Sequence, residues 1–185
     1  MAHSNSPTIT SGRFRGRRLV VPAGQITRPT RSLVRQALFD MMGPAIVGAH
    51  VLDLYSGSGA LGLEALSRGA SHVIFVERHR RALAALKANI ATCGPDRGEY
   101  SMLAMDATQW QPAADQPIDV VQADPPFALT DTLPEALEQP GVLAEDALLI
   151  FHAPAERAAV DVGPGWALNR TRSYGRSSVH LFFRS

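Results

Sequence analysis

Short apolar runs and helical patterns alternate along most of the chain. The expected strands are residues 51–55, 73–76, 100–105, 118–123, 147–152, 166–172 and 178–183, the last two as an antiparallel pair. Helical patterns follow the first two strands, up to about residue 68 and over 78–93. This alternation is typical of a doubly wound, mostly parallel α/β sheet, whose ligands bind at the carboxyl ends of the strands.

The residues before the first strand have a different pattern. Positions 8–21 alternate loosely around Gly12 and Gly16, which predicts a short hairpin. The apolar spacing over 33–42 predicts a helix that ends at Gly43 and Pro44. We therefore expect a small basic N-terminal extension over residues 1–30 and one main domain over 31–185.

Composition narrows the class of protein. The chain has 185 residues, of which 45% are hydrophobic and 19% are charged, so global disorder is excluded. No apolar run approaches the roughly 20 residues of a membrane span, and residues 1–6 lack the apolar core of a signal peptide. The expectation is a cytoplasmic protein without membrane contact. The single cysteine, Cys93, excludes an intramolecular disulfide and a multi-cysteine metal site.

Charge is strongly segregated, although the net charge is only +1. Residues 1–39 contain seven arginines and no acid, and residues 170–185 contain four arginines and no acid. The acids all lie between them. Two basic ends around an acidic middle have two interpretations. We favour a surface that binds the phosphates of a polyanion such as RNA over a surface that is merely solvated. The expected RNA-binding residues are Arg13, Arg15, Arg17, Arg18, Arg28, Thr30, Arg31 and Arg35, and Arg170, Arg172 and Arg176 could extend this face.

A glycine-rich turn follows the first strand. Gly57, Gly59 and Gly62 match G-x-G-x-x-G, and Glu77 lies twenty residues after Gly57, as in dinucleotide sites. Asp53, at the end of the strand, would repel a pyrophosphate. It suits the ammonium and sulfonium of S-adenosylmethionine, which we favour over a nicotinamide cofactor or a turn without a ligand.

A second motif, Asp124-Pro125-Pro126-Phe127, follows the fourth strand. The prolines stiffen the backbone and remove two donors, so acceptors are exposed. Acceptors that hold both hydrogens of an exocyclic base amine can direct its lone pair at a methyl group, and Phe127 offers a stacking face. A rigid loop without chemistry is the alternative.

Asp106, after the third strand, could accept a hydrogen bond from the adenine amine of the cofactor or be a solvated turn acid. The histidines are scattered, so no metal site is expected, and His72 and His152 are interpreted as structural.

Together these motifs resemble the RsmD-like methyltransferases, which methylate the N2 amine of a guanine in bacterial 16S ribosomal RNA. The resemblance extends from about Ile9 to Arg184. It rests on residues 10–19, on Thr27-Arg-Pro-Thr30 with residues 34–39, on the glycine loop within 52–66, on Asp124 to Phe127 and on Tyr174-Gly175. Tyr55-Ser56 stands where the family often has phenylalanine and alanine, a small departure.

The resemblance implies a Rossmann-like class I S-adenosylmethionine-dependent methyltransferase fold, seven-stranded, with the last strand antiparallel. It implies an rRNA (guanine-N2)-methyltransferase that uses S-adenosylmethionine without a metal and releases S-adenosylhomocysteine. Asp124, Pro125, Pro126 and Phe127 would hold the guanine. The expected cofactor-binding residues are Asp53, Tyr55, Gly57, Gly59, Glu77, Arg78, Asp106 and Ala107. The partner would be small-subunit rRNA, within the 30S subunit or an assembly intermediate, bound by a monomer.

Three other functions stay open at this point. An adenine-N6 or cytosine-N4 methyltransferase would use the same kind of proline-proline-aromatic loop. A non-enzymatic RNA-binding assembly factor would need neither Asp124 nor the glycines, yet both are present. A nicotinamide oxidoreductase would need a further domain to hold its substrate.

Overall fold

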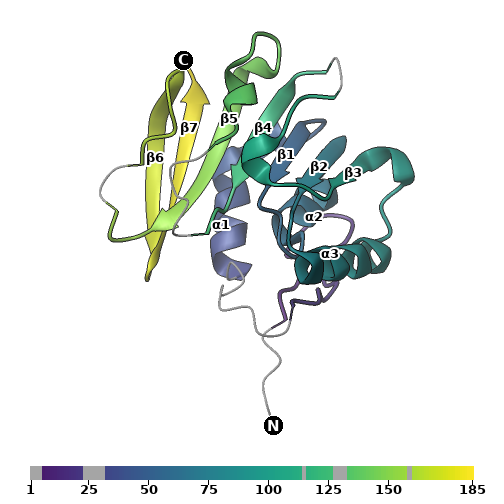
Figure 1. The fold of residues 1–185 in the computed structure, drawn as a ribbon. Coiled ribbons are helices and arrows are strands. Elements are labelled where there is room, and N and C mark those ends of the chain that lie inside the picture. The colour runs from purple at the N-terminus through teal and green to yellow at the C-terminus, as the bar shows by residue number, and fades with distance from the viewer. Residues whose placement is uncertain (1–5, 23–31, 114–115, 127–132, 158–159) are drawn as a thin grey trace.

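The computed structural model describes residues 6–22, 32–113, 116–126, 133–157 and 160–185, and its centre is one seven-stranded sheet (Figure 1). The strands are β1 (His50–Leu54), β2 (His72–Val76), β3 (Tyr100–Leu103), β4 (Ile118–Ala123), β5 (Leu143–Pro154), β6 (Trp166–Tyr174) and β7 (Ser177–Arg184). They lie in the order β3-β2-β1-β4-β5-β7-β6. Neighbours from β3 to β5 are parallel, and β7 is antiparallel to both β5 and β6. The expected sheet with its last strand reversed is confirmed.

The described residues also include three α-helices and four short 3-10 helices, of which the first of each kind precedes β1. The α-helices are α1 (Ser32–Met42), α2 (Ala60–Ser67) and α3 (Arg80–Cys93). The 3-10 helices are η1 (Gly43–Ile46), η2 (Arg97–Glu99), η3 (Ala107–Gln109) and η5 (Glu135–Glu138). The helix α1 ends at Met42, and the chain continues directly as the 3-10 helix η1, because Pro44 fits the first turn of a new helix. Strand β5 starts at Leu143 rather than 147, because Leu143 pairs with Ile118 through an irregular register.

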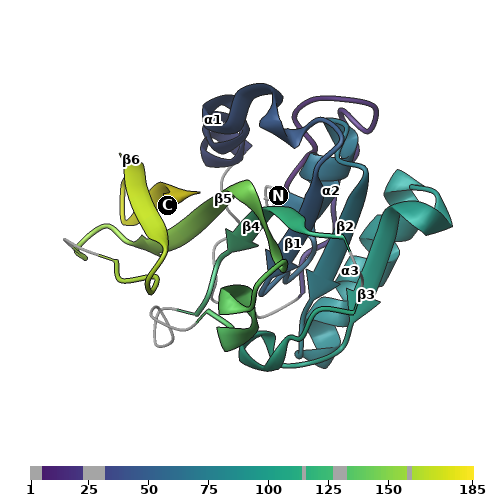
Figure 2. The same cartoon turned by 90° about the horizontal axis from the view of Figure 1, so that it is seen from above.

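The two faces of the sheet are covered differently. Buried apolar side chains from α1, α2 and α3 contribute to one core, packed on alternate strand residues such as Val51, Val73 and Ile150. Figure 2 shows α1 and α2 together on one side of the sheet. The opposite core, which includes Leu52 and Phe151, is covered in the described residues by η3, η5 and irregular segments. None of the described helices is long and apolar enough to span a membrane.

The N-terminal segment, residues 6–22, packs onto the helical face. Its expected hairpin consists of one isolated bridge, Thr8 to Arg18, closed by tight turns. Ile9, Phe14 and Leu19 are buried in the same core as α2. The expected boundary at residue 30 falls outside the described residues, so the division into two domains stays a prediction.

Candidate functional site

The acidic residues singled out from the sequence follow adjacent strands of the sheet. Glu77 follows β2, Asp53 lies near the end of β1, and Asp124 follows β4. Asp106 follows β3, one strand further out. Since these strands are parallel neighbours, their carboxyl ends share one edge, and the glycine loop after β1 lies at its middle.

Asp53 is a buried carboxyl beside two other acids. It is 1% exposed, and its Oδ2 accepts a hydrogen bond from the Gly62 amide at 3.1 Å. Burial, together with the charges of Asp124 and Glu77, raises the pKa of Asp53 to about 8, against the opposing effect of the Gly62 bond. Such a site disfavours further negative charge and favours a cation.

The three glycines of the loop have different tasks. A Cβ on Gly59 would lie 2.3 Å from Leu86 Cδ1, and one on Gly62 would lie 2.3 Å from Phe75 Cε1. These two glycines therefore allow α2 to pack closely. A Cβ on Gly57 would meet only the Tyr55 carbonyl oxygen, at 3.9 Å, so a ligand can approach the backbone there.

Tyr55 joins β1 to this loop in a strained conformation. Its φ is +59°, the single positive φ among the non-glycine residues that the structure describes. Bulky residues seldom adopt this region, and such outliers concentrate at ligand sites. The side chain packs on the core of the second face.

Glu77 is fixed by the backbone and keeps free acceptor capacity. Its Oε2 accepts from the Gly57 amide at 2.8 Å, and its Oε1 accepts from the His79 amide at 2.7 Å. A carboxylate has about four lone-pair positions, so two hydroxyl donors can still bind. This arrangement fits the two hydroxyls of a ribose.

Arg78 and Asp106 connect the ends of β2 and β3. The Arg78 guanidinium lies 2.5 Å from Asp106 Oδ2, while Asp106 Oδ1 accepts from the amide and hydroxyl of Thr108. The Thr108 bonds, and then Arg78, lower the pKa of Asp106. Asp106 thus caps η3, which begins at the buried Ala107, and has little acceptor capacity left for an adenine amine.

Asp124 reaches the surface at the end of β4. Its side chain is 41% exposed, whereas Pro125 is buried and Pro126 is exposed. Phe127 lies outside the described residues. On the next strand, His152 Nδ1 lies 3.6 Å from Asp124 Oδ1. His152 has no sequence signal that separates it from a structural histidine, but the pairing of β4 with β5 brings it beside Asp124.

The N-terminal arginines lie in different surroundings. Arg15 and Arg18 are exposed. Arg13 forms an ion pair with Glu99, and the Arg17 guanidinium donates to the Thr92 carbonyl in the last turn of α3. Arg28, Thr30 and Arg31 lie outside the described residues.

Arg35 is placed differently from what the charge pattern predicted. It is 0% exposed, and it donates to Glu64 and to the Thr8 carbonyl. A side chain inside the protein cannot contact an RNA phosphate, so Arg35 is removed from the expected RNA-binding surface. Its position on α1 faces α2, because the buried carboxylate of Glu64 needs a cation there.

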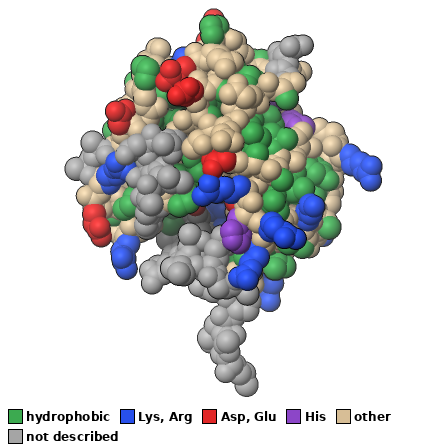
Figure 3. Space-filling model, viewed as in Figure 1, with side chains coloured by type: hydrophobic (Ala, Val, Ile, Leu, Met, Phe, Trp, Pro, Cys, Tyr) green, Lys and Arg blue, Asp and Glu red, His purple; other side chains and the backbone are tan. Residues whose placement is uncertain are grey.

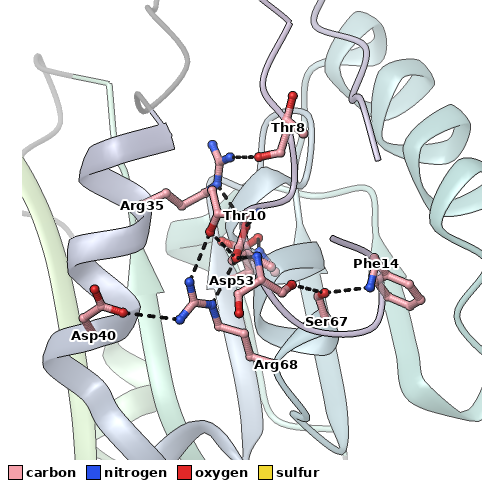
Figure 4. A network of polar contacts seen from close by, with 11 residues as sticks. Thr8, Thr10, Phe14, Arg35, Asp40, Asp53, Ser67 and Arg68 are labelled. Carbon is pink, nitrogen blue, oxygen red and sulfur yellow. Dashed lines mark hydrogen bonds and ion pairs between the residues drawn. The ribbon is translucent and has the colours of Figure 1, made fainter. Parts of the chain in front are cut away.

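The buried ion pair is the centre of a network that fastens the N-terminal segment to α2 (Figure 4). Glu64 also accepts from the amides of Thr10 and Ser11 and from Arg68. Figure 4 shows Arg68 beside Asp40 of α1, and the Arg68 guanidinium forms ion pairs with both Asp40 and Glu64. Residues 8–11 are thereby held against both helices.

Asn89 links the same segment to the glycine loop. It is fully buried on α3. Its Nδ2 donates to the carbonyls of Val20 and Ser58, each at 2.8 Å, and its Oδ1 accepts from the Val20 amide at 2.7 Å. Nothing in the local pattern separates it from an ordinary helix residue.

Basic side chains also gather outside the two basic ends of the chain. Figure 3 shows Lys and Arg side chains over α3. Arg80, Arg81 and Lys87 of this helix are exposed. The charge pattern of the sequence did not predict this basic surface, because the middle of the sequence has a net negative charge.

Comparison with known proteins places the chain in a family. The model of the family Conserved hypothetical protein 95 matches residues 8–183. The chain is 36% identical over 186 residues to Ribosomal RNA small subunit methyltransferase D of Escherichia coli K12, which covers 98% of this chain and 93% of that protein. It is 32% identical over 179 residues to the protein of the same name from Haemophilus influenzae, covering 94% and 92%.

A solved structure agrees with these sequence matches. The Escherichia coli protein YhhF, described as a putative methyltransferase, superposes with a TM-score of 0.83 at 34% identity, covering 97% of this chain and 98% of that one. Its agreement over the whole length extends to the N-terminal segment as well as to the sheet.

Proposed function

The chain belongs to the Conserved hypothetical protein 95 family, the RsmD-like methyltransferases, and from that premise we propose that it methylates the N2 amine of a guanine in small-subunit ribosomal RNA with S-adenosylmethionine. The observation that carries this proposal is the buried carboxyl of Asp53 at the glycine loop, whose pKa is raised to about 8 by burial and by the charges of Asp124 and Glu77. A cationic cofactor favours the ionised form of Asp53, and a base amine supplies donors to Asp124.

The residues present suit S-adenosylmethionine. Glu77 would accept from the ribose hydroxyls, and Asp53 would face the positive charge of the methionine part through the loop. Arg78, Asp106 and Ala107 would border the adenine, and Tyr55 would shape the loop. The cofactor supplies, when bound, an activated methyl group on a sulfonium.

The chain's own residues would do the remaining work by position. Asp124 would accept a hydrogen bond from the amine, so that the nitrogen lone pair points along the carbon–sulfur bond of the methyl group. Asp124 or water would take the proton that the amine loses when it is methylated. Rigid placement of this kind supplies a large part of a transfer rate. Pro125 and Pro126 would keep the acceptors in place, and Phe127 would stack on the base.

The RNA would be held by basic residues. Exposed Arg15 and Arg18, with Arg80, Arg81 and Lys87 of α3, offer phosphate contacts, and Arg28, Thr30 and Arg31 are expected to add to them. We propose a cytoplasmic monomer that acts on the 30S subunit or an assembly intermediate. The small-subunit rRNA named for the Escherichia coli relative supports this substrate.

The test is single-turnover methyl transfer to small-subunit particles by the Asp124→Ala variant. Cofactor and RNA affinity should remain, because Asp124 is assigned to the amine alone. Transfer should fall by orders of magnitude, since amine orientation acts mainly in the transition state. Near-normal transfer would reject the role of Asp124. A product methylated on adenine or cytosine would reject the guanine assignment.

A further inference from the structure

His152 lies beside Asp124 on the neighbouring strand. β4 and β5 are parallel, with Gln122 opposite Ile150 and Ala123 opposite Phe151. Continued by one residue, this register sets Asp124 next to His152, and alternation along the strands puts both side chains on the helical face. The resulting distance from His152 Nδ1 to Asp124 Oδ1 is 3.6 Å.

The two partners differ in burial. The His152 side chain is 7% exposed, while that of Asp124 is 41% exposed. The imidazole is therefore fixed by packing, and the carboxylate extends from it toward the surface. A buried ring beside an exposed carboxylate limits the directions in which that carboxylate can turn.

The other polar groups near His152 leave Nδ1 available for Asp124. His152 Nε2, like both polar atoms of the fully buried Gln122, has no hydrogen-bond partner in the described part of the chain. His180, whose pKa is lowered first by burial and then by the charge of His152, is engaged by Thr171 and Ser178. His180 therefore does not compete for Asp124.

We propose that His152 is a positioning residue for methyl transfer, whose Nδ1–H donates to the Asp124 carboxylate and holds its other oxygen toward the base amine. The inference rests on the proposed function, because it needs Asp124 to orient that amine. The separation is an ion-pair distance slightly longer than a hydrogen bond. Contacts of this kind tighten when the substrate is bound.

The experiment compares His152→Leu with His152→Asn in single-turnover transfer to small-subunit particles at saturating cofactor and RNA. Leucine fills the space without a donor, so the rate constant should fall about tenfold, which corresponds to about 1.4 kcal/mol. Asparagine places a neutral donor near the position of Nδ1 and should recover most of the rate. The cofactor Kd and the RNA KM should change less than twofold in both variants, which a general loss of packing would not give.

Two controls separate this inference from its premise. His50→Leu removes a histidine at the opposite, amino end of β1 and should leave the rate unchanged. In an Asp124→Ala background, His152→Leu should cause no further loss, because the partner is already absent. A wild-type rate in His152→Leu, an asparagine variant as slow as the leucine variant, or a full tenfold loss in the double variant would overturn the inference. Normal transfer by Asp124→Ala alone would instead reject the role of Asp124 in the proposed function, on which the inference rests.

Discussion

The raised pKa of Asp53 predicts that cofactor affinity increases with pH. In the free protein the carboxyl is held neutral below about pH 8 by burial and by the charges of Asp124 and Glu77. A bound cation favours the ionised form and lowers this pKa, so binding releases a proton. We expect the affinity for S-adenosylmethionine to rise from pH 6 to pH 8.

The size of the effect follows from the ionised fraction. With a free-state pKa of about 8 and a much lower one in the complex, the affinity should change by up to about tenfold per pH unit below 8. The affinity measurements must stop near pH 8, because the α-amino group of the cofactor itself titrates at about 7.7–8.0.

Isothermal titration calorimetry measures both quantities. Titrations between pH 6 and pH 8 give the slope, and buffers of different ionisation enthalpy give the number of protons released. Asp53→Asn is the matched control, because it keeps the shape and removes the titrating group. S-adenosylhomocysteine, which lacks the sulfonium charge, should show a weaker dependence.

Two results would refute this reasoning. One is an affinity that stays constant between pH 6 and pH 8, with no proton release in any buffer. The other is an Asp53→Asn variant with the wild-type slope, which would assign the titration to another group.

Four further results are expected. Glu77→Ala should weaken S-adenosylmethionine binding at least tenfold by calorimetry, since each charged bond to a ribose hydroxyl is worth about 1.5–3 kcal/mol, whereas a cofactor analogue without ribose hydroxyls should lose much less. Combined Arg15→Ala and Arg18→Ala substitutions should lower RNA affinity and flatten its salt dependence, by a slope of about 0.7–0.9 per lost phosphate contact in filter-binding assays; an unchanged slope would remove them from the RNA surface. Glu64→Gln removes one partner of the buried Arg35–Glu64 ion pair and should reduce the free energy of unfolding in urea by about 3–5 kcal/mol, and a neutral effect would contradict the importance of that pair. Asp53→Asn should make the free protein more stable toward pH 8 than the wild type, because a carboxyl with a raised pKa costs stability as pH rises from about 4 to about 8, and equal thermal unfolding profiles across that range would exclude it.

Much of the fold was predictable because its signals are local. The strand patterns, Gly69 and Gly94 after two helices, and the G-x-G-x-x-G turn each depend on a few consecutive residues. The seven-stranded sheet with its last strand antiparallel was implied by the family resemblance, whereas the order of the strands came from the structure. The element boundaries were less accurate: β5 begins four residues early, since its pairing with β4 near Leu143 is set by the partner strand.

The remaining features depend on contacts between distant residues. Arg35 has the same sequence signal as an exposed arginine, and only the packing of α1 on Glu64 distinguishes it. Asn89 and His152 gain their partners from the N-terminal segment and from β4, which the chain brings near only after folding. The sequence could place Asp53 at a ligand edge, but not reveal that it is almost fully buried.

The N-terminal segment, residues 6–22, is attached to parts of the chain that are synthesised much later, which affects the order of folding. Thr10 finds its partner Glu64 after 54 residues, Val20 finds Asn89 after 69, and Arg13 finds Glu99 after 86. During synthesis from the N-terminus, at roughly 5–20 residues per second, this segment waits several seconds for α2 and α3 to emerge. Contacts so far apart in sequence carry a large loop-closure entropy and form late. Substitutions at Thr10 or Arg13, whose side chains bond Glu64 and Glu99, should therefore accelerate unfolding in stopped-flow experiments and leave the refolding rate nearly unchanged.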